Sequence, residues 1–94
     1  MITRLVKLPL IKEKTETFKA LFLSIKATIL KFEGCMHLEL LWEKEDTGIA
    51  FTHSQWRTEN DLAAYMASEF FRTTWPEVKK LLAGRPEAWS LTKS

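Results

Sequence analysis

The spacing of apolar residues changes abruptly at Gly34, and this change constrains the fold more than any other feature of the sequence. Before Gly34 an apolar stripe runs at helical spacing, formed by Phe18, Leu21, Phe22, Ile25, Ile29 and Phe32. After it, apolar residues fall at every second position, at Met36, Leu38, Leu40 and Trp42. The first spacing is typical of an amphipathic helix and the second of a half-buried β-strand. The sequence therefore predicts a helix over about 12–32, ended by Gly34, and a strand over 36–44.

Three further segments have the character of strands. Residues 2–9 alternate and are closed by Pro9, which predicts a first strand. Residues 49–57 are β-branched and aromatic and follow an Asp-Thr-Gly turn, so they predict the return strand of a hairpin. Residues 88–92 predict a short last strand, with Trp89 and Leu91 on one face.

Two helical segments lie between the hairpin and the last strand. Thr58 and Asp61 form a variant of the capping box, which predicts the start of a short helix over 59–67. A second helical stretch is expected from Ser68 to about residue 83. Pro76 removes a backbone hydrogen bond within this stretch, so we expect a kink or a fresh helix start there.

The predicted order is β-α-β-β-α-β within a single domain that spans residues 1–94. This is the order of the ferredoxin-like fold, an α+β architecture in which a four-stranded antiparallel sheet carries its helices on one face. The opposite sheet face would expose large apolar residues, either Trp56 and Trp89 or their strand partners Phe51 and Leu91. Because an exposed apolar face favours association with a second copy, we expect a homodimer through the sheet faces.

Composition excludes several classes of protein. The formal net charge is +2 and the lysines are scattered, so the chain lacks the basic patch of a nucleic-acid-binding protein. The single cysteine, Cys35, permits no intrachain disulfide and fits a reducing compartment. Arg4 and Lys7 interrupt the apolar N-terminus, which argues against a signal peptide, and the apolar helix segment 20–25 is too short to span a bilayer. We expect a cytoplasmic protein with no membrane partner.

Four segments, taken in order, resemble one known family. They are FEGCMHLEL at 32–40, FTHSQW at 51–56, the pattern L-x-x-Y-x-x-S-E-x-F at 62–71, and Trp75. Together they resemble the antibiotic biosynthesis monooxygenase (ABM) family over nearly the whole chain. The resemblance implies a dimeric α+β barrel, built from two ferredoxin-like subunits packed sheet to sheet, with a small-molecule cavity between sheet and helices in each subunit.

The family includes more than one chemistry. Some members oxygenate anthrones or quinols with no metal or flavin, and others degrade haem. The haem-degrading branch carries an Asn, a Trp and a His at positions that align with Thr3, Tyr65 and Trp75. All three residues depart from that pattern, and a Trp side chain cannot ligate iron, so haem degradation is disfavoured and no cofactor is expected.

We therefore expect a cofactor-independent monooxygenase acting on a quinol or polycyclic aromatic molecule. Such a reaction needs a base for the substrate proton, an apolar box, and hydrogen-bond donors for reduced oxygen. The aromatic-rich sequence favours this interpretation. A non-catalytic small-molecule-binding or stress-associated module of the same fold is the alternative, because the sequence shows no compact catalytic constellation.

The two histidines are the natural candidates for the base. If a four-residue turn pairs residue 44 with residue 49, His37 and Glu39 share one sheet face with Trp56, while His53 lies on the opposite face. This register predicts that the two histidines do not meet, so it disfavours a metal site. A slip of one residue would reverse the assignment.

We expect His53 to be the catalytic base, because helices should cover its sheet face, and Tyr65 to hold a second substrate oxygen. The alternative places His37 on the helix side. The expected substrate-binding residues are Thr3, Trp56, Phe71 and Trp75. Each candidate also has a structural interpretation, as a hydrated or interface strand residue for His37 and as core packing for the aromatic residues.

Two other polar side chains have structural and functional interpretations. Arg4 is expected to pair with a carboxylate such as Glu39, and its alternative role is to anchor an anionic substrate. Cys35 follows a helix C-terminus, where the helix dipole disfavours a thiolate, so we interpret it as a packing residue.

Overall fold

The computed structural model describes all residues, 1–94, and confirms the predicted order of elements. The strands are β1 (Ile2–Pro9), β2 (Cys35–Trp42), β3 (Ile49–Trp56) and β4 (Glu87–Leu91). The helices are α1 (Thr15–Leu30), α2 (Glu59–Met66) and α3 (Glu69–Lys79), and a 3-10 turn, η1 (Lys12–Lys14), precedes α1.

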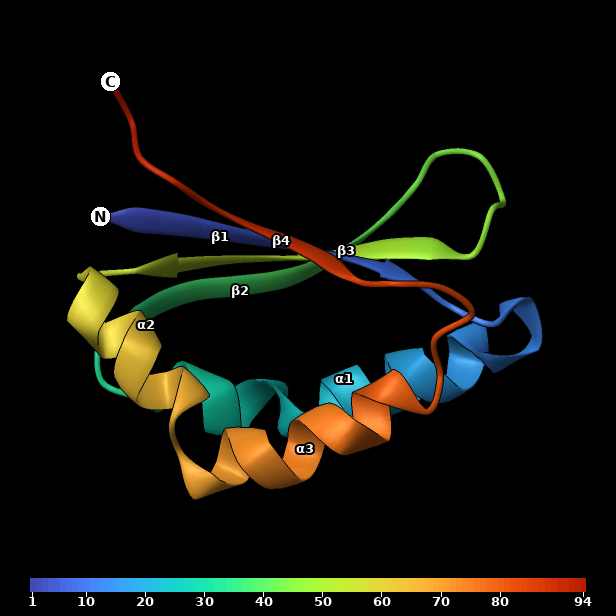
Figure 1. Ribbon diagram of the computed structural model, residues 1–94, viewed down its shortest axis with the longest axis horizontal. Coiled ribbons are helices and arrows are strands. Elements are labelled where there is room, and N and C mark those ends of the chain that lie inside the picture. The colour runs from blue at the N-terminus through green and yellow to red at the C-terminus, as the bar shows by residue number, and fades with distance from the viewer.

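The four strands form one antiparallel sheet in the order β2-β3-β1-β4. The hairpin strands β2 and β3 are neighbours, and β1 lies between β3 and β4, as the ferredoxin-like fold requires. All three helices lie on the same side of the sheet (Figure 1). The predicted α+β, ferredoxin-like fold is therefore confirmed.

We term the helix-covered side of the sheet the inner face and the opposite side the outer face. Side chains alternate between the two faces along each strand. The inner face includes Arg4, Val6 and Leu8 of β1, Leu38 of β2, and Thr52, Ser54 and Trp56 of β3. The outer face includes Thr3 and Leu5 of β1, His37, Glu39 and Leu41 of β2, Phe51, His53 and Gln55 of β3, and Trp89 and Leu91 of β4.

The hairpin register differs by one residue from the prediction. The structure places Glu39 opposite His53, because the connecting loop closes one residue earlier on β2, where the Glu43 N–H donates to the Ile49 carbonyl at 3.0 Å. A slip of one residue moves every side chain of a strand to the other face relative to its partner. The predicted separation of the two histidines onto opposite faces is therefore wrong.

A β-bulge at the start of β2 is the second local departure. The pairing shifts between Cys35, which lies opposite Trp56, and His37, which lies opposite Gln55. Met36 is the extra residue, and its side chain is exposed. A bulge inserts one residue into one strand only, so Cys35 packs against the core while His37 points to the outer face.

The core lies between the inner face and the helices. One cluster of buried apolar residues contains Leu8, Leu10, Phe18, Phe22, Ile29, Leu38, Ala50, Trp56, Leu62 and Val78. The Trp56 indole N–H donates to Ser54 Oγ at 3.0 Å, so this buried side chain has its one polar group satisfied. Large apolar side chains of the outer face lack such cover, and Leu41, Trp89 and Leu91 are 42%, 41% and 43% exposed.

The two helices after the hairpin begin at side-chain caps. Thr58 Oγ1 accepts from the Asp61 N–H at 3.1 Å, which confirms the predicted cap. Ser68 Oγ accepts from the Phe71 N–H at the same distance and caps α3. Helix α3 continues through Pro76 to Lys79 without a fresh start.

Helix α1 ends at Leu30, slightly earlier than predicted. Gly34 then turns the chain into β2 with a φ of +82°, a conformation that a residue with a Cβ rarely adopts. None of the three helices combines the length and the apolar character that crossing a bilayer requires.

Candidate functional site

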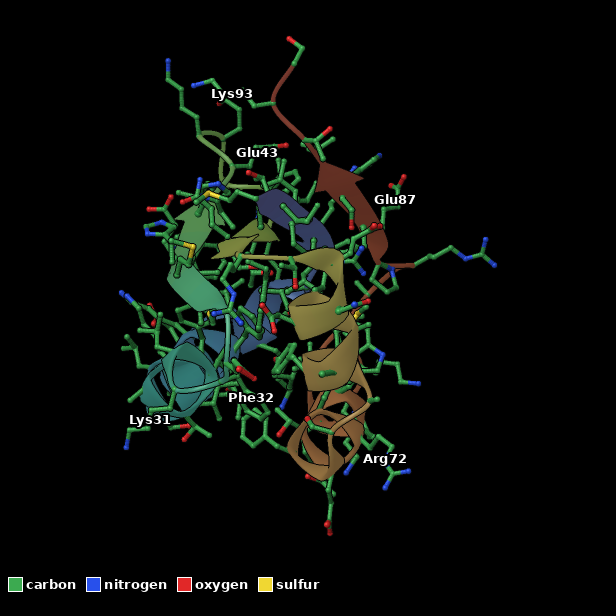
Figure 2. All side chains as sticks on the ribbon, turned by 90° about the vertical axis from the view of Figure 1, so that its left-hand side faces the viewer. Lys31, Phe32, Glu43, Arg72, Glu87 and Lys93 are labelled. Atoms are coloured by element: carbon green, nitrogen blue, oxygen red, sulfur yellow. The ribbon has the colours of Figure 1, made fainter.

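A cavity lies between the inner face and the three helices. Its volume is about 300 Å³, and 15 of its 21 lining residues are hydrophobic. Side chains reach into the space between the layers from the sheet above and from α1 and α3 below (Figure 2). A mostly apolar cavity of this size with a few polar groups is typical of small-molecule sites.

Four aromatic side chains form a continuous wall of this cavity. Tyr65 of α2 stacks on Trp56 of β3, with ring centroids 5.0 Å apart. Its edge meets Phe71 of α3 at 5.2 Å, and Phe71 stacks on Trp75 at 6.0 Å. We term these four residues the aromatic wall. They were all predicted as site residues from the sequence, and the structure brings them together.

Tyr65 holds the centre of the aromatic wall and is mostly buried. Burial, with a smaller Coulombic contribution from the Cys35 thiol, raises the pKa of Tyr65 to about 12. The phenol is therefore neutral at physiological pH and can donate a hydrogen bond, but it cannot serve as an anionic base. Its ring is held from a third side by Phe32, with centroids 5.0 Å apart.

Arg4 contributes the only cationic side chain of the cavity lining. One guanidinium nitrogen donates to Ser90 Oγ at 3.0 Å, and the other approaches Met66 Sδ at 3.6 Å. None of the seven ion pairs in the structure includes Arg4. The predicted pairing with Glu39 is wrong, because the two side chains lie on opposite faces of the sheet. A guanidinium without a carboxylate partner is suited to bind an oxyanion.

The remaining polar groups of the lining are few. Ser54 is buried and accepts from the Trp56 indole, and Thr52 lies beside it on the same face of β3. Glu87 is the only acidic residue of the lining, but its carboxylate lies 3.8 Å from Nζ of Lys7, its partner across the strands on the outer face. No histidine or cysteine belongs to the lining, so the cavity lacks the side chains that most often ligate transition metals.

The two histidines meet on the outer face instead. Glu39 Oε1 lies 2.8 Å from His53 Nδ1 and 3.2 Å from His37 Nε2. The hydrogen bond with His53, followed by the one with His37, lowers the pKa of Glu39. We term these three residues the His-Glu-His cluster. It results from the hairpin register, because Glu39 faces His53 across the strands and His37 precedes Glu39 by two residues on the same face of β2.

Three site predictions are corrected by these positions. His53 and Thr3 lie on the outer face and do not line the cavity, so neither can contact a molecule bound there. His37, the alternative base, also points away from the helices. The catalytic role of Tyr65 and the substrate-binding roles of Trp56, Phe71 and Trp75 remain predictions. Sequence reasoning underrated Arg4, although its position two residues before Val6 on an alternating strand was a usable signal.

Solved structures with the same fold span the whole chain. A conserved protein from Methanosarcina mazei Go1 is 26% identical, with a TM-score of 0.91 over 100% of this chain and 94% of that chain. A protein described as antibiotic biosynthesis monooxygenase is 14% identical, with a TM-score of 0.90 over 100% and 99%. A candidate antibiotic biosynthesis monooxygenase from Caulobacter crescentus is 19% identical, with a TM-score of 0.90 over 99% and 89%. At these identities, the likeness shows a shared fold.

Sequence comparison identifies the family. No curated protein sequence matches the chain. The sequence model of the family described as antibiotic biosynthesis monooxygenase, however, matches residues 1–76, which include β1, α1, the hairpin, α2 and most of α3. Of the seven elements that contribute residues to the cavity lining, the match includes five in full. On this match the chain belongs to the antibiotic biosynthesis monooxygenase family.

Proposed function

We propose that the protein is a monooxygenase that oxidises a quinol or polycyclic aromatic molecule in the cavity without a cofactor. The observation that carries this proposal is a positive Arg4 guanidinium with no carboxylate partner at a cavity walled by aromatic rings. Family membership supports the class of reaction. The apolar volume of about 300 Å³ suits a flat, fused-ring substrate.

The proposed reaction starts with loss of a substrate proton. A phenol or the enol form of an anthrone releases its O–H proton to water, and the aryl oxyanion pairs with the Arg4 guanidinium. One electron then passes from the ring carbon to dioxygen, and the resulting radical and superoxide combine into a C–O bond. Protonation gives a hydroperoxide, whose O–O bond and geminal C–H bond break to release water and leave a carbonyl. Overall, a CH₂ group and O₂ yield C=O and H₂O.

The side chains act through charge and shape. Arg4 lowers the pKa of the bound substrate hydroxyl, because an adjacent positive charge stabilises the anion. Tyr65, neutral because burial raises its pKa to about 12, donates a hydrogen bond to the second oxygen or to the developing peroxide. The aromatic wall holds the ring system by stacking and keeps water from the reduced oxygen species.

We infer that two copies pack through their outer faces. Leu41, Trp89 and Leu91 expose large apolar surfaces there, and all five residues of β4 are exposed. Burial of these side chains against a second copy would remove apolar surface from water. Sedimentation at micromolar concentration tests this inference, with a species of about twice the 11.0 kDa chain mass expected. A stable species of one chain mass would contradict it.

We also infer a cytoplasmic location. Cys35 is the only cysteine and is a free thiol, as is usual for proteins of a reducing compartment. Fractionation of cells that produce the protein tests this inference, and recovery outside the cytoplasm would contradict it.

Oxygen consumption is the direct test of the proposed activity. Chelator-treated protein, with no added flavin, is supplied with hydroquinones and anthrones in an oxygen electrode. We expect one O₂ consumed for each carbonyl formed, without accumulation of hydrogen peroxide. Activity that appears only on addition of flavin or metal would overturn the cofactor-independent part of the proposal, and no turnover across the panel would overturn the enzymatic part.

Two variants connect the activity to the cavity. Removal of an oxyanion-stabilising group lowers kcat by about 10²–10³ in other enzymes, so we expect Arg4→Met and Tyr65→Phe to lose activity on this scale. Lys7→Gln is the matched control, because Lys7 is a cation of the same strand that pairs with Glu87. Equal turnover by Arg4→Met and Lys7→Gln would remove Arg4 from the mechanism.

A small-molecule-binding module of the same fold is the second candidate function. It is favoured by the lack of a histidine in the cavity lining, whose one acidic residue, Glu87, pairs with Lys7 on the outer face. Binding of an aromatic ligand that quenches Trp56 and Trp75 fluorescence, with no oxygen consumption by the same protein, would identify this function.

A further inference from the structure

We propose that His37, Glu39 and His53 form a binding site for one divalent transition-metal ion, of which Zn²⁺ is the representative. The site lies on the outer face, so it is separate from the cavity. Each residue offers one ligand atom, and these three atoms lie within 4.8 Å of one another.

The distances are close to those that a metal ion requires. Zn²⁺ binds histidine nitrogen and carboxylate oxygen at about 2.0–2.2 Å, so neighbouring ligand atoms of a tetrahedral site lie roughly 3.3 Å apart. Glu39 Oε1 already lies 2.8 Å from His53 Nδ1 and 3.2 Å from His37 Nε2. The two histidine nitrogens lie within 4.8 Å of each other, and both rings are partly exposed, so side-chain rotation can bring the three ligand atoms to the spacing of a bound ion.

The backbone holds the three ligands in place. His53 lies directly opposite Glu39 on the neighbouring strand, and His37 precedes Glu39 by two residues on the same strand. Three ligands from one face of a rigid sheet leave the fourth position of the ion directed away from the sheet, towards water or towards a second copy packed on the outer face. Two histidines with one carboxylate and an open position is a donor set known for catalytic zinc and for non-haem iron.

The surroundings favour a cation. Gln55 lies opposite His37 and Leu5 lies opposite His53, and both are uncharged. Lys7, two residues beyond Leu5 on the same face, pairs with Glu87 at 3.8 Å. No lysine or arginine forms an ion pair with Glu39. Imidazole ligands select zinc, copper, nickel and iron over magnesium and calcium.

The metal site would not take part in the proposed oxygenation. The sheet separates the cluster from the cavity, because His37, Glu39 and His53 point to the face opposite that of Trp56 and Ser54. Oxygenase activity after chelation and metal binding by the cluster are thus independent measurements, and failure of one leaves the other standing.

Calorimetric titration with ZnCl₂ tests the proposal. The protein carries no polyhistidine tag and is first treated with a chelator. We expect one Zn²⁺ per chain, a higher melting temperature with bound ion because the ion binds only the folded state, and no binding of Mg²⁺ under the same conditions. Absence of saturable Zn²⁺ binding, or equal binding of Mg²⁺, would overturn the proposal.

Variants locate the ion. Loss of a residue that only hydrogen-bonds to a metal ligand lowers metal affinity by about 10- to 100-fold. Loss of a ligand itself should therefore cost about 100-fold or more. We expect this loss of Zn²⁺ affinity in each of three variants, His37→Gln, Glu39→Gln and His53→Gln. Glu43→Gln is the control, because Glu43 is an exposed carboxylate of the same hairpin outside the cluster. If a cluster variant that keeps the circular dichroism of the unmodified chain binds Zn²⁺ as tightly as Glu43→Gln, the site is elsewhere.

The spectrum of bound Cu²⁺ gives a second readout. Two imidazole nitrogens should produce nitrogen hyperfine splitting in the electron paramagnetic resonance spectrum of the unmodified chain. His53→Gln should reduce the splitting to that of one nitrogen. A spectrum unchanged by this substitution would contradict the assignment of His53 as a ligand.

Discussion

The two faces of the sheet differ in what covers them and in the chemistry they hold. The inner face meets three helices, and between them lies an apolar cavity that contains one unpaired cation, Arg4. The outer face is left open by the helices (Figure 1) and holds the His-Glu-His cluster beside exposed apolar residues such as Trp89. Both faces are built by the same strands, with side chains that alternate between them.

The difference between the faces separates the candidate bases from the candidate substrate cavity, which often lie together in an enzyme. Titratable groups that could act as a base are on the outer face, whereas the space for an aromatic substrate is on the inner face. A mechanism in the cavity therefore has to use charge stabilisation by Arg4 and donation by Tyr65 rather than a histidine base. The following predictions alter one face at a time.

Replacement of one tryptophan on each face by alanine should give the largest difference in unfolding free energy. Trp56 is 1% exposed and Trp89 is 41% exposed. Replacement of a buried Trp by Ala costs about 3–5 kcal/mol, so Trp56→Ala should lose this amount in urea-induced unfolding. Trp89→Ala should lose much less at low protein concentration, where any contact between copies is absent.

The same pair of variants tests the use of the outer face. If two copies bury Trp89, the stability difference between Trp89→Ala and the unmodified chain should increase with protein concentration. Equal losses for Trp56→Ala and Trp89→Ala at every concentration would show that the two faces are covered alike.

Substitution of Gly34, in the turn that leads into β2, should reduce the unfolding free energy nearly as much. A Cβ on Gly34 would overlap the Asp61 side chain, which is held by Arg57 at 3.1 Å. A left-handed conformation costs a non-glycine residue about 1–2 kcal/mol, and overpacking costs about 1–3 kcal/mol. Gly34→Ala should therefore lose roughly 2–5 kcal/mol of unfolding free energy.

Gly84→Ala is the matched control for this turn. A Cβ there would make an ordinary contact of 3.4 Å with the Pro9 side chain, and its backbone does not require a positive φ. The control should change the unfolding free energy by less than about 0.5 kcal/mol. A similar loss in both variants would show that the conformation of Gly34 is not the cause.

The element order could be predicted from the sequence because each segment repeats its spacing over several residues. The helical stripe from Phe18 to Phe32 and the alternation from Leu38 to Trp42 are signals of this kind, and both elements are present. The aromatic wall could be predicted for the same reason, since Tyr65, Phe71 and Trp75 lie on the helix faces that the apolar pattern assigns to the core.

The side of the sheet on which the histidines lie could not be predicted in this way. It depends on one residue of loop length between Glu43 and Ile49, just as the face of Cys35 depends on one extra residue at Met36. Both are single-residue features, and the alternation of side chains is the same on either side of them. His53 was therefore assigned to the wrong face, and the partnership with Glu39 was missed.

Alkaline pH should destabilise the protein through the inner face. Burial raises the pKa of Tyr65 to about 12 in the folded chain, against about 10 for an unfolded tyrosine. Between these values the folded state holds a proton that the unfolded state has released, so stability is lost as the pH rises. The loss should reach about 2–3 kcal/mol near pH 12. It is measured as the decrease in unfolding free energy between pH 9 and pH 11.5.

Tyr65→Phe is the control for this pH dependence, because it keeps the ring that stacks on Trp56 and removes the ionisable group. The decrease between the two pH values should be smaller in the variant than in the unmodified chain. Identical decreases would show that other groups cause the alkaline loss and that Tyr65 ionises in the folded chain as easily as in water.

Loss of the cap between α2 and α3, two of the helices that cover the inner face, should give the smallest decrease in unfolding free energy. Ser68 Oγ accepts from the Phe71 N–H at 3.1 Å and donates to the Tyr65 carbonyl at 2.6 Å, so one hydroxyl joins the two helices that carry the aromatic wall. Removal of such a cap costs about 1 kcal/mol, which is the loss expected for Ser68→Ala in urea-induced unfolding.

Thr73→Ala is the control, because its hydroxyl donates only to the Phe70 carbonyl on an exposed helix surface. Since the cap also sets the angle at which Phe71 meets Tyr65, Ser68→Ala should weaken binding of an aromatic ligand while Thr73→Ala leaves it unchanged. Unaltered ligand affinity in Ser68→Ala would mean that packing against the sheet, rather than the cap, positions the aromatic wall.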